Sequence, residues 1–416
     1  MKKRIAFISE HASPLATLGG TDCGGQNVYV GELARHIARL GFDIDIFTRK
    51  DDEQLAETVC WIPGVRVIHI KSGPEASVPK EELMPYMKEF TGNMLAFIRR
   101  ENPGYALIHA NFWMSAMVAA DLKKILGIPF VVTFHALGYI RKLYQKEQDR
   151  FPPERVRIET AIVQEADHVI AECPQDREDL IGYYAAAPEK ISIIPCGFNP
   201  QEFYPVERAL ARMVLNLDPE EKILLQLGRM VPRKGVENVI LALKHLKHRR
   251  QPVRLLVVGG GSEHPGNIRE PEIARLTGIA REAGVLPLVT FAGRRNRDVL
   301  KYYYAAADIF VTTPWYEPFG ITPLEAMACG IPVIGSDVGG IRYSVADGKT
   351  GFLVPPHDPV ALARRALMLL NDARLAGTMS RNALQRVNTL FTWAGVAGAA
   401  ARLYEKIMLP RYSMIS

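Results

Sequence analysis

Short apolar runs rich in Val, Ile and Phe alternate along the chain with longer segments whose apolar residues recur at helical spacing. This alternation is typical of parallel strands joined by crossover helices, and it predicts an α/β fold. In the first half we expect strands at 5–9, 42–48, 65–70, 107–110, 130–134, 168–171 and 191–194. The same alternation is repeated in the second half of the chain. There we expect strands at 222–227, 253–258, 289–293, 309–313, 333–336 and 351–354. The sequence therefore predicts two doubly wound, Rossmann-like domains.

A segment with three prolines, residues 195–205, interrupts both periodicities and marks a domain boundary. We predict an N-terminal domain over 1–200 and a C-terminal domain over 201–385. Residues 386–416 should form a helical segment that packs back toward the N-terminal domain, because apolar residues recur at helical spacing over 393–408. Further helices are expected over 79–100, 236–248 and 298–306. The carboxyl ends of the two sets of strands should border one interdomain cleft, where ligands bind in such sheets.

The charge balance excludes some classes of partner. The 416 residues carry 51 Lys and Arg against 45 Asp and Glu, a net charge of +6 without a long run of one sign. We therefore expect no nucleic-acid partner and at most an affinity for phosphorylated small molecules. The five cysteines form no C-x-x-C pair, which favours a cytoplasmic protein without structural zinc. No stretch approaches 18 apolar residues, so no integral membrane contact is expected. The oligomeric state is left open.

A glycine-rich loop, residues 19–27, follows the first expected strand and runs into a helix. Glycines let backbone N–H groups approach an anion closely at a helix N-terminus. The spacing matches neither the dinucleotide G-x-G-x-x-G nor the P-loop pattern. Binding of a nicotinamide dinucleotide and a P-loop nucleotide site are therefore both disfavoured. A plain strand-to-helix turn is the alternative.

His135 stands at the carboxyl end of a predicted buried strand, a position from which side chains reach a ligand. A lone histidine more often has a structural role. A functional role for His135 is therefore favoured only by the residues that accompany it. The basic residues that follow it could clamp a phosphorylated acceptor, since the guanidinium fork of arginine suits phosphate. They are Arg141, Lys142, Arg155 and Arg157. A solvated helix face is the alternative for this basic set.

Two further pairs of charged residues lie in the second half. Arg229 and Lys234 follow a predicted strand and could neutralise a diphosphate. Glu317 and Glu325, eight residues apart, could hold the hydroxyls of a sugar and of a ribose. Asp43 and Asp45 form a D-x-D sequence inside a strand, and we interpret that pair as structural.

On these residues the chain resembles family 4 of the retaining glycosyltransferases, which have the GT-B fold. The string from Glu317 to Glu325 matches the E-x-x-x-x-x-x-x-E motif of that family. The Arg229–Lys234 pair, the Gly24–Gly25 loop and His135 stand in the expected order beside it. The resemblance covers nearly the whole chain.

The resemblance implies a role for each of these residues. Arg229 and Lys234 would bind the donor phosphates, and Glu317 the donor sugar. His135 would contact the sugar near its 6-hydroxyl, and these four residues form the predicted catalytic set. The family reacts by front-face attack without a required cofactor, so the resemblance implies no metal, a UDP-sugar as donor substrate and UDP as product. The donor site would comprise Gly24, Gly25, Arg229, Lys234, Gly293, Arg294, Glu317, Phe319, Gly320, Ile321, Thr322, Leu324 and Glu325.

Two groups within the family are similar around the expected acceptor site, the sucrose-phosphate synthases and the D-inositol-3-phosphate glycosyltransferases. Both accept a phosphorylated sugar or cyclitol. The inositol-phosphate enzymes have H-Y-W where this chain has Asn111-Phe112-Trp113, so a tyrosine hydroxyl expected on the acceptor phosphate is missing. The acceptor site would comprise Gln26, Asn27, Lys80, Arg141, Arg155 and Arg157.

The leading hypothesis is therefore transfer of glucose from UDP-glucose to fructose 6-phosphate, giving sucrose 6-phosphate and UDP, a step of sucrose biosynthesis. One alternative is N-acetylglucosaminyl transfer to inositol phosphate, or glucosyl transfer to another sugar or to a lipid. An alternative of another class is a non-catalytic nucleotide-sugar binder.

Overall fold

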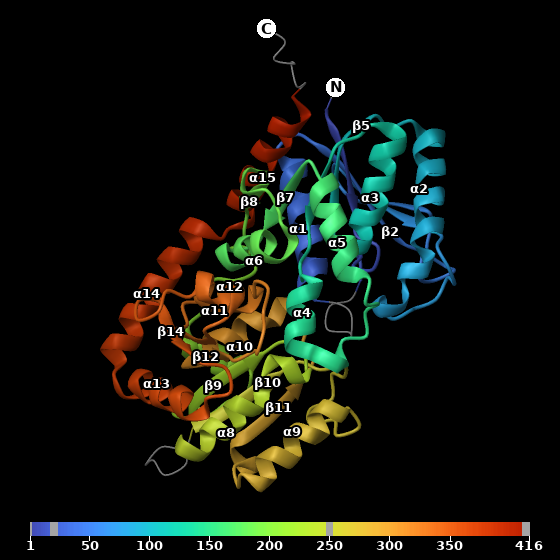
Figure 1. Ribbon diagram of the computed structural model, residues 1–416. Coiled ribbons are helices and arrows are strands. Elements are labelled where there is room, and N and C mark those ends of the chain that lie inside the picture. Colours follow the sequence, from blue (N-terminus) through green and yellow to red (C-terminus); the bar gives the residue numbers. More distant parts are fainter. Residues whose placement is uncertain (1, 17–23, 247–252, 410–416) are drawn as a thin grey trace. The chain divides into compact units, whose positions relative to one another are not determined.

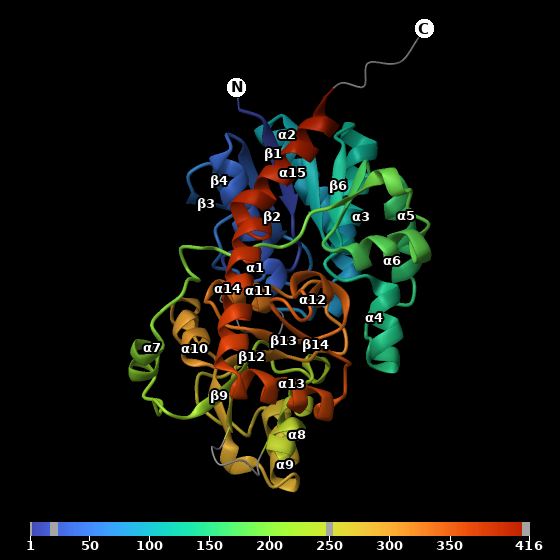
Figure 2. The ribbon, with the colours of Figure 1, turned by 90° about the vertical axis from the view of Figure 1, so that its left-hand side faces the viewer.

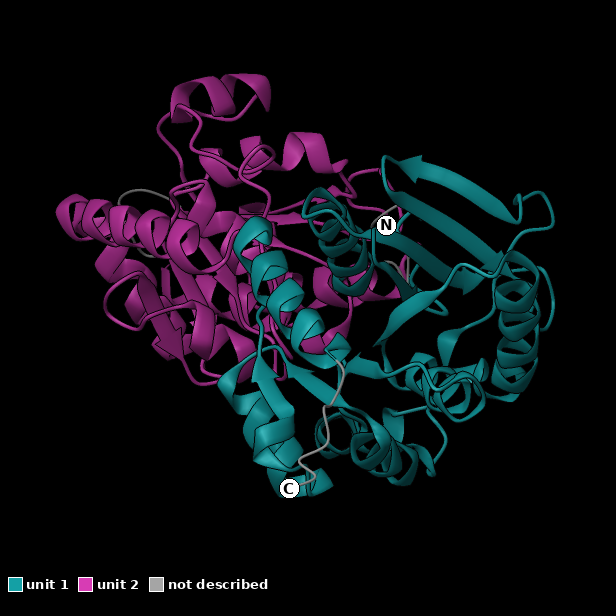
Figure 3. Ribbon diagram, turned by 90° about the horizontal axis from the view of Figure 1, so that it is seen from above, with its two compact units in different colours: residues 1–16, 25–195, 393–416 teal, residues 17–24, 196–392 magenta. Residues whose placement is uncertain are grey.

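The computed structural model describes residues 2–16, 24–246 and 253–409. The chain divides into two compact units (Figure 3): unit 1 contains residues 1–16, 25–195 and 393–416, and unit 2 contains residues 17–24 and 196–392. The chain thus leaves unit 1 after Pro195, five residues before the predicted boundary, and returns to it at Trp393. Each unit is built around its own twisted sheet (Figure 1), which confirms the α/β class.

Unit 1 contains, in the described part of the chain, an eight-stranded sheet in the order β3-β4-β2-β1-β5-β6-β7-β8. The apolar runs predicted as strands form its centre, where Ile5, Val67 and Val132 are fully buried. The strands are β1 (Arg4–Ile8), β2 (Asp43–Arg49), β3 (Thr58–Ile62), β4 (Val65–Ile70), β5 (Tyr105–Asn111), β6 (Phe130–Thr133), β7 (His168–Ala171) and β8 (Ile191–Ile193).

Strand β3 was not predicted, and it runs antiparallel to β4 at the edge of an otherwise parallel set of described strands. Its side chains are half-buried or exposed, so it lacks the apolar run that identified the central strands. The turn at Pro63-Gly64, where Gly64 has a positive φ of 79°, joins it to β4. An edge strand of this kind leaves little hydrophobic signal in a sequence.

The helices of unit 1 lie in two groups. Helix α15 packs beside α1 (Figure 2), whereas α2, α3 and α5 lie side by side in another layer (Figure 1). The helix expected over 79–100 begins only at Met87, because Pro79 and Pro85 lead into two short 3-10 turns instead. The helices are α1 (Gly25–Arg39), α2 (Met87–Glu101), α3 (Trp113–Leu126), α4 (Gly138–Gln145), α5 (Arg155–Glu165), α6 (Pro174–Tyr184) and α15 (Trp393–Met408).

Helix α15 spans 393–408, the segment whose periodicity predicted it. Its apolar stripe, which includes Trp393, is buried within unit 1. Near its end, the hydroxyl of Tyr404 lies 2.6 Å from Nδ1 of His109 on β5. Burial, together with the nearby charge of His135, lowers the pKa of His109 to about 3, so its imidazole is neutral in this core. The contact ties the C-terminal helix to the central strands of unit 1.

Unit 2 contains, among its described residues, a six-stranded parallel sheet in the order β11-β10-β9-β12-β13-β14. Its strands match the predicted runs within one residue: β9 (Lys222–Leu227), β10 (Val253–Val258), β11 (Val289–Gly293), β12 (Ile309–Thr312), β13 (Val333–Ser336) and β14 (Gly351–Val354). Its helices are α7 (Arg208–Val214), α8 (Val236–Leu246), α9 (Pro271–Glu282), α10 (Leu300–Ala306), α11 (Ile321–Ala328), α12 (Gly339–Ser344), α13 (Pro359–Asn371) and α14 (Ala373–Leu390).

Two helix starts in unit 2 show how the sequence sets these boundaries. The carboxylates of Asp358 and Asp372 accept hydrogen bonds from the N–H groups three residues on, at 2.8 and 2.9 Å, and cap α13 and α14. Helix α10 begins at Leu300, after a 3-10 turn that occupies the start of the predicted 298–306 segment. The end of the predicted 236–248 helix, residues 247–248, lies outside the described residues.

Candidate active site

Polar residues follow four adjacent strands of unit 1 at one edge of the sheet. Glu10 follows β1, Asn111 ends β5, His135 follows β6 and Glu172 follows β7. Because these strands are parallel and neighbours in the sheet, their carboxyl ends meet at the same edge. His135 is thus placed where the sequence predicted it, and it has neighbours that the sequence did not reveal.

Both ring nitrogens of His135 have partners. Its Nδ1 lies 3.1 Å from Oε1 of Glu172, and its Nε2 lies 3.1 Å from Oδ1 of Asn111. The ring of Tyr29 on α1 meets the imidazole edge-on, with centroids 4.7 Å apart. The backbone of His135 is left-handed, with φ at +58°, which a residue with a Cβ adopts only when its surroundings hold it there.

The first turn of α1 carries Gln26 and Asn27 to the same edge. Nε2 of Gln26 donates to Oγ of Ser9 at 3.2 Å and to the carbonyl oxygen of Asn111 at 3.3 Å. Asn27 is buried and donates to the carbonyl oxygen of Ser13 at 2.9 Å. The part of the glycine loop at 19–23 lies outside the described residues.

The structure brings two of the predicted basic residues together. Glu81 lies 3.4 Å from Nζ of Lys80 and 3.5 Å from Nη2 of Arg141, so one carboxylate links two cations that are distant in sequence. Nε of Arg141 also donates to Asp149 at 2.8 Å. Arg157 is exposed on α5, and no contact places it in this group among the described residues.

Arg155 lies in a buried aromatic cage. Its Nε donates to Oε1 of Glu159 at 2.7 Å, and its guanidinium lies over the rings of Phe112 and Phe151, 4.9 and 4.5 Å from their centroids. The side chain is only 2% exposed. Its buried Nη1 has no hydrogen-bond partner among the described residues. A buried donor without a partner is costly, so this atom has unused capacity for one hydrogen bond.

In unit 2, cations surround Glu317. Lys234, in a 3-10 turn after β9, donates to Oε2 of Glu317, and Nη1 of Arg233 lies 3.5 Å from the same oxygen. Burial opposes the charge of Glu317, but the attraction of Lys234, Arg233 and Arg229 prevails and lowers the pKa of Glu317 to about 2. The pKa of Lys234 is lowered to about 8, chiefly by burial, against the attraction of Glu317 and with the help of the two arginines. This excess of positive charge suits a diphosphate.

The segment from Glu317 to Phe319 is held by a glycine pair that the sequence reasoning missed. The N–H of Gly340 donates to the carbonyl oxygens of Glu317 and Pro318 at 3.2 and 3.1 Å. A Cβ at Gly339 would lie 2.1 Å from the carbonyl oxygen of Glu317, and one at Gly340 would lie 2.2 Å from Cα of Phe319. The close approach therefore requires glycine at both positions. Without a three-dimensional contact, Gly339-Gly340 looks like an ordinary turn.

Glu325 lies on α11, nearly fully buried. Its Oε2 accepts a hydrogen bond from the hydroxyl of Tyr304 at 2.8 Å, and its Oε1 lies 2.9 Å from Nη1 of Arg297. Both oxygens therefore already have partners, and a ribose would have to share them. Leu324 beside it is fully buried in the core.

The remaining predicted donor residues lie at strand ends and at the start of α11. Gly320 has a positive φ of 89° and precedes Ile321, the first residue of α11, whose N-terminus can face an anion. Gly293 ends β11 with a φ of 78°. Within unit 2, a Cβ at Gly24 would lie 3.5 Å from Nε of Arg229. Three further predicted residues, Arg294, Phe319 and Thr322, adjoin these turns.

A carboxylate–histidine pair at the end of β1 was also missed. Nδ1 of His11 lies 2.7 Å from Oε1 of the fully buried Glu10, whose other oxygen accepts a hydrogen bond from Ser115. The ring of His11 packs edge-on against Phe112, with centroids 4.9 Å apart. The segment Ser9-Glu10-His11 carries no motif that would mark the pair in the sequence. Only in the structure does Ser115 on α3 meet the carboxylate of Glu10.

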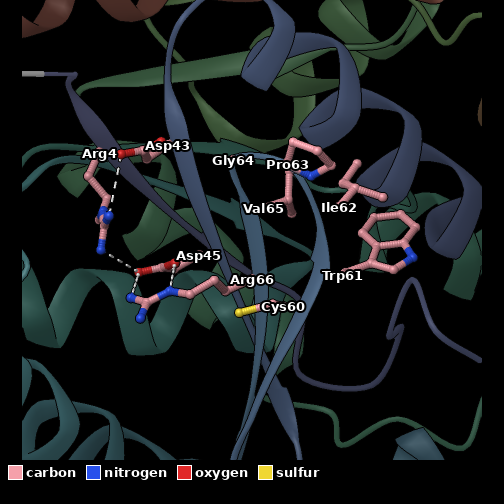
Figure 4. Close-up of a pocket in the computed structure, with 10 residues that line it drawn as sticks. All are labelled: Arg4, Asp43, Asp45, Cys60, Trp61, Ile62, Pro63, Gly64, Val65 and Arg66. Atoms are coloured by element: carbon pink, nitrogen blue, oxygen red, sulfur yellow. Dashed lines mark hydrogen bonds and ion pairs between the residues drawn. The ribbon is translucent and has the colours of Figure 1, made fainter.

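The two aspartates of the D-x-D sequence line a pocket of about 480 Å³ at the β3–β4 edge of unit 1 (Figure 4). Arg66 donates to both oxygens of Asp45, at 2.8 and 2.7 Å, and Tyr105 donates to Oδ2 at 2.6 Å. Arg4 pairs with Asp43 at 3.3 Å. These ion pairs occupy the carboxylates, in keeping with the structural interpretation.

The described part of the chain offers neither a candidate metal site nor a candidate membrane span. No group of three or more His, Cys, Asp or Glu side chains in that part of the chain is arranged to hold a metal ion. No helix there is long and apolar enough to cross a membrane. The absence of a metal requirement stays a prediction.

Comparison with known proteins identifies the family. Residues 23–202 match the family described as Glycosyltransferase Family 4, and residues 207–386 match the one described as Glycosyl transferases group 1. D-inositol 3-phosphate glycosyltransferase 2 of Catenulispora acidiphila is 34% identical over 98% of this chain and 95% of that protein. The chain belongs to glycosyltransferase family 4. D-inositol 3-phosphate glycosyltransferase of Corynebacterium jeikeium is 36% identical over 97% of each chain.

Among solved structures, sucrose-phosphate synthase from Thermosynechococcus elongatus is similar over 98% of this chain and 99% of its own, with a TM-score of 0.89 and 37% identity. Membership of the family, together with two sheets whose described strands are parallel except for β3, confirms the GT-B fold and a nucleotide-sugar-dependent hexosyltransferase. Of these three similar proteins, two are named D-inositol 3-phosphate glycosyltransferases and one a sucrose-phosphate synthase, the two groups that the sequence had suggested.

Proposed function

We propose that this glycosyltransferase moves a sugar from a nucleotide-sugar donor to a phosphorylated polyol, with N-acetylglucosaminyl transfer to inositol phosphate as the favoured reaction. The names of the two curated relatives support this acceptor, because both are D-inositol 3-phosphate glycosyltransferases that match along nearly the whole chain. This reverses the order of the two acceptors that the sequence alone suggested.

The observation that carries the proposal of a phosphorylated acceptor is Nη1 of Arg155. It is a buried donor on a charged side chain, and it lacks a partner among the described residues. An acceptor phosphate oxygen would complete its hydrogen bonding. Lys80 and Arg141, which share Glu81, would add positive charge from the same unit.

In the proposed reaction, unit 2 binds the donor diphosphate through Arg229 and Lys234, and Glu317 holds the donor sugar. The bond from the sugar's anomeric carbon to the diphosphate breaks, and a new bond to an acceptor hydroxyl forms on the same face. The leaving phosphate oxygen takes the proton of that hydroxyl. The cations beside Glu317 stabilise the negative charge that develops on the diphosphate.

Fructose 6-phosphate is the second candidate acceptor, with UDP-glucose as donor. The similarity to the sucrose-phosphate synthase structure, with a TM-score of 0.89, favours it. The residues Asn111-Phe112-Trp113 also favour it, because the inositol-phosphate enzymes have a tyrosine where this chain has Phe112.

The test is release of the nucleoside diphosphate by purified protein. UDP-N-acetylglucosamine, UDP-glucose, ADP-glucose and GDP-glucose are each offered with inositol phosphate, fructose 6-phosphate and fructose. Turnover of UDP-N-acetylglucosamine with inositol phosphate alone supports the favoured reaction, and turnover only with fructose 6-phosphate supports the second. No turnover with any pair contradicts both.

The Lys234→Ala variant separates an enzyme from a nucleotide-sugar binder. An enzyme should lose turnover and UDP affinity together, whereas a binder would lose affinity with no turnover to lose. Lys244→Ala is the matched control, because Lys244 is an exposed lysine of α8 in the same unit. It should leave both quantities unchanged.

A further inference from the structure

The partners of His135 set its chemistry. Glu172 offers a carboxylate oxygen to Nδ1 and Asn111 an amide oxygen to Nε2, each at 3.1 Å. Nδ2 of Asn111 donates to the carbonyl oxygen of His109 at 3.3 Å, which orients the amide so that its oxygen faces His135. A carboxylate oxygen accepts hydrogen bonds, so Nδ1 of His135 faces Glu172 as the donor.

We infer that Glu172 is a positioning residue, which fixes the plane of the His135 imidazole and the hydrogen on its Nδ1 for the sugar transfer proposed above. The effect on turnover rests on that proposed function. The contact itself does not, because it is a property of unit 1 in the absence of any ligand.

Glu172 is itself held in place. Its backbone N–H donates to Oδ2 of Asp176 at 2.9 Å, in the turn between β7 and α6. Burial, and then the charge of Glu172, raise the pKa of Asp176 to about 8. The side chains of Glu172 and His135 are 5% and 9% exposed. A hydrogen bond to a charged group shielded from water is stronger than an exposed one, so it can hold the ring against thermal motion.

The positioning has a chemical consequence. With a hydrogen held on Nδ1 by the carboxylate of Glu172, Nε2 is the ring nitrogen that faces Asn111. The left-handed backbone at His135 directs the side chain back across the strand ends, between Asn111 and Glu172. Two partners on opposite sides then fix the ring in one orientation, which a single partner would not do.

The first test is a double-mutant cycle measured as nucleoside diphosphate release with the accepted substrate pair. Glu172→Gln should lower kcat by about 10- to 100-fold, the scale of losing the carboxylate partner of a functional histidine. The same substitution in a His135→Ala background should change kcat by less than about threefold, because Glu172 acts through the ring. Equal losses in both backgrounds would overturn the inference.

The second measurement needs no substrate. In protein labelled with ¹⁵N at histidine, the Nδ1–H of His135 should give a slowly exchanging proton signal, assigned by its absence in His135→Ala. Glu172→Gln should remove or shift it, and Glu178→Gln, which changes an exposed glutamate of α6, should not. A His135 signal unchanged in Glu172→Gln overturns the inference. Loss of the signal upholds the positioning even if no acceptor is turned over, and in that case only the proposed reaction fails.

Discussion

Lys234 donates a hydrogen bond to Glu317 from a different loop of unit 2, although the two residues are 83 positions apart. Lys234 follows β9, and Glu317 lies between β12 and α11. The loops are joined further where the N–H of Trp315 donates to the carbonyl oxygen of Arg233 at 2.9 Å. The contact places the predicted phosphate-binding lysine and the predicted sugar-binding glutamate in one cluster.

Replacing Glu317 with Gln should therefore lower turnover strongly. The change removes the charge that pairs with Lys234 and the group proposed to hold the donor sugar. We expect kcat to fall by about two to four orders of magnitude, measured as UDP release. Glu282→Gln, which alters an exposed glutamate of α9 in unit 2, serves as the control. Near-normal turnover in Glu317→Gln would refute the role of this residue.

The pKa of Lys234 is lowered to about 8, mainly by burial. It predicts that kcat/KM for the donor declines on the basic side of its pH profile. Below this pH the free enzyme carries the positive charge that the donor phosphates require. As pH rises through about 8 the charge is lost, so kcat/KM for the donor should fall. Lys234→Arg keeps its charge at every accessible pH and should abolish this decline. If kcat/KM of Lys234→Arg still fell as pH rises through about 8, a group other than Lys234 would be responsible for the decline.

The lowered pKa of Glu317 predicts a loss of stability in acid. A carboxyl whose folded pKa is about 2 instead of 4.5 stabilises the fold fully above pH 4.5, and this contribution disappears as pH falls toward 2. Urea unfolding of wild type and Glu317→Gln at several pH values measures it. The wild type should lose more stability than the variant between pH 4.5 and 2. Parallel losses in the two proteins would contradict the predicted linkage.

Arg155→Ala tests the acceptor site. Losing a charged hydrogen bond to the acceptor phosphate should raise the acceptor KM by about 10- to 100-fold and leave the donor KM nearly unchanged. Because Glu159 would lose its buried partner, thermal unfolding must first show that the variant is folded. Arg99→Ala, at an exposed arginine of α2, controls for the change in net charge. Equal effects on both KM values would refute an acceptor role.

Phe112→Tyr addresses the choice between acceptors. The variant gains the hydroxyl that the inositol-phosphate enzymes are expected to place on the acceptor phosphate, next to the guanidinium of Arg155. We expect kcat/KM for inositol phosphate to rise relative to that for fructose 6-phosphate by about 10-fold, the value of one charge-assisted hydrogen bond. An unchanged ratio would place the Phe112 ring edge away from the acceptor phosphate.

The sequence predicted the central strands because each is a buried apolar run, and such runs need no knowledge of their neighbours. Strand β3 escaped because an edge strand with half-exposed side chains has no such run. The helix expected from residue 79 begins at Met87, because local proline geometry there overrides the amphipathic pattern. The pattern of apolar residues therefore predicts strands that are buried on both faces. It fails for edge strands, and for helix ends whose position is set by prolines.

The same distinction applies to the site. His135, Lys234 and Glu317 stand in motifs and were predicted from them. Glu172 was not, because it follows an ordinary strand, and only its distance of 3.1 Å from a residue 37 positions earlier reveals it. Gly339 and Gly340 were missed for the same reason, since their need for glycine comes from the backbone of Glu317 and Phe319.

The most direct test of a phosphorylated acceptor compares each acceptor with its parent lacking the phosphate. The wild-type rate of UDP release is measured with inositol phosphate against inositol, and with fructose 6-phosphate against fructose. We expect that removing the phosphate from the true acceptor lowers kcat/KM by at least about 100-fold, because the buried Nη1 of Arg155 would be left without an acceptor. Equal rates with and without the phosphate would contradict it.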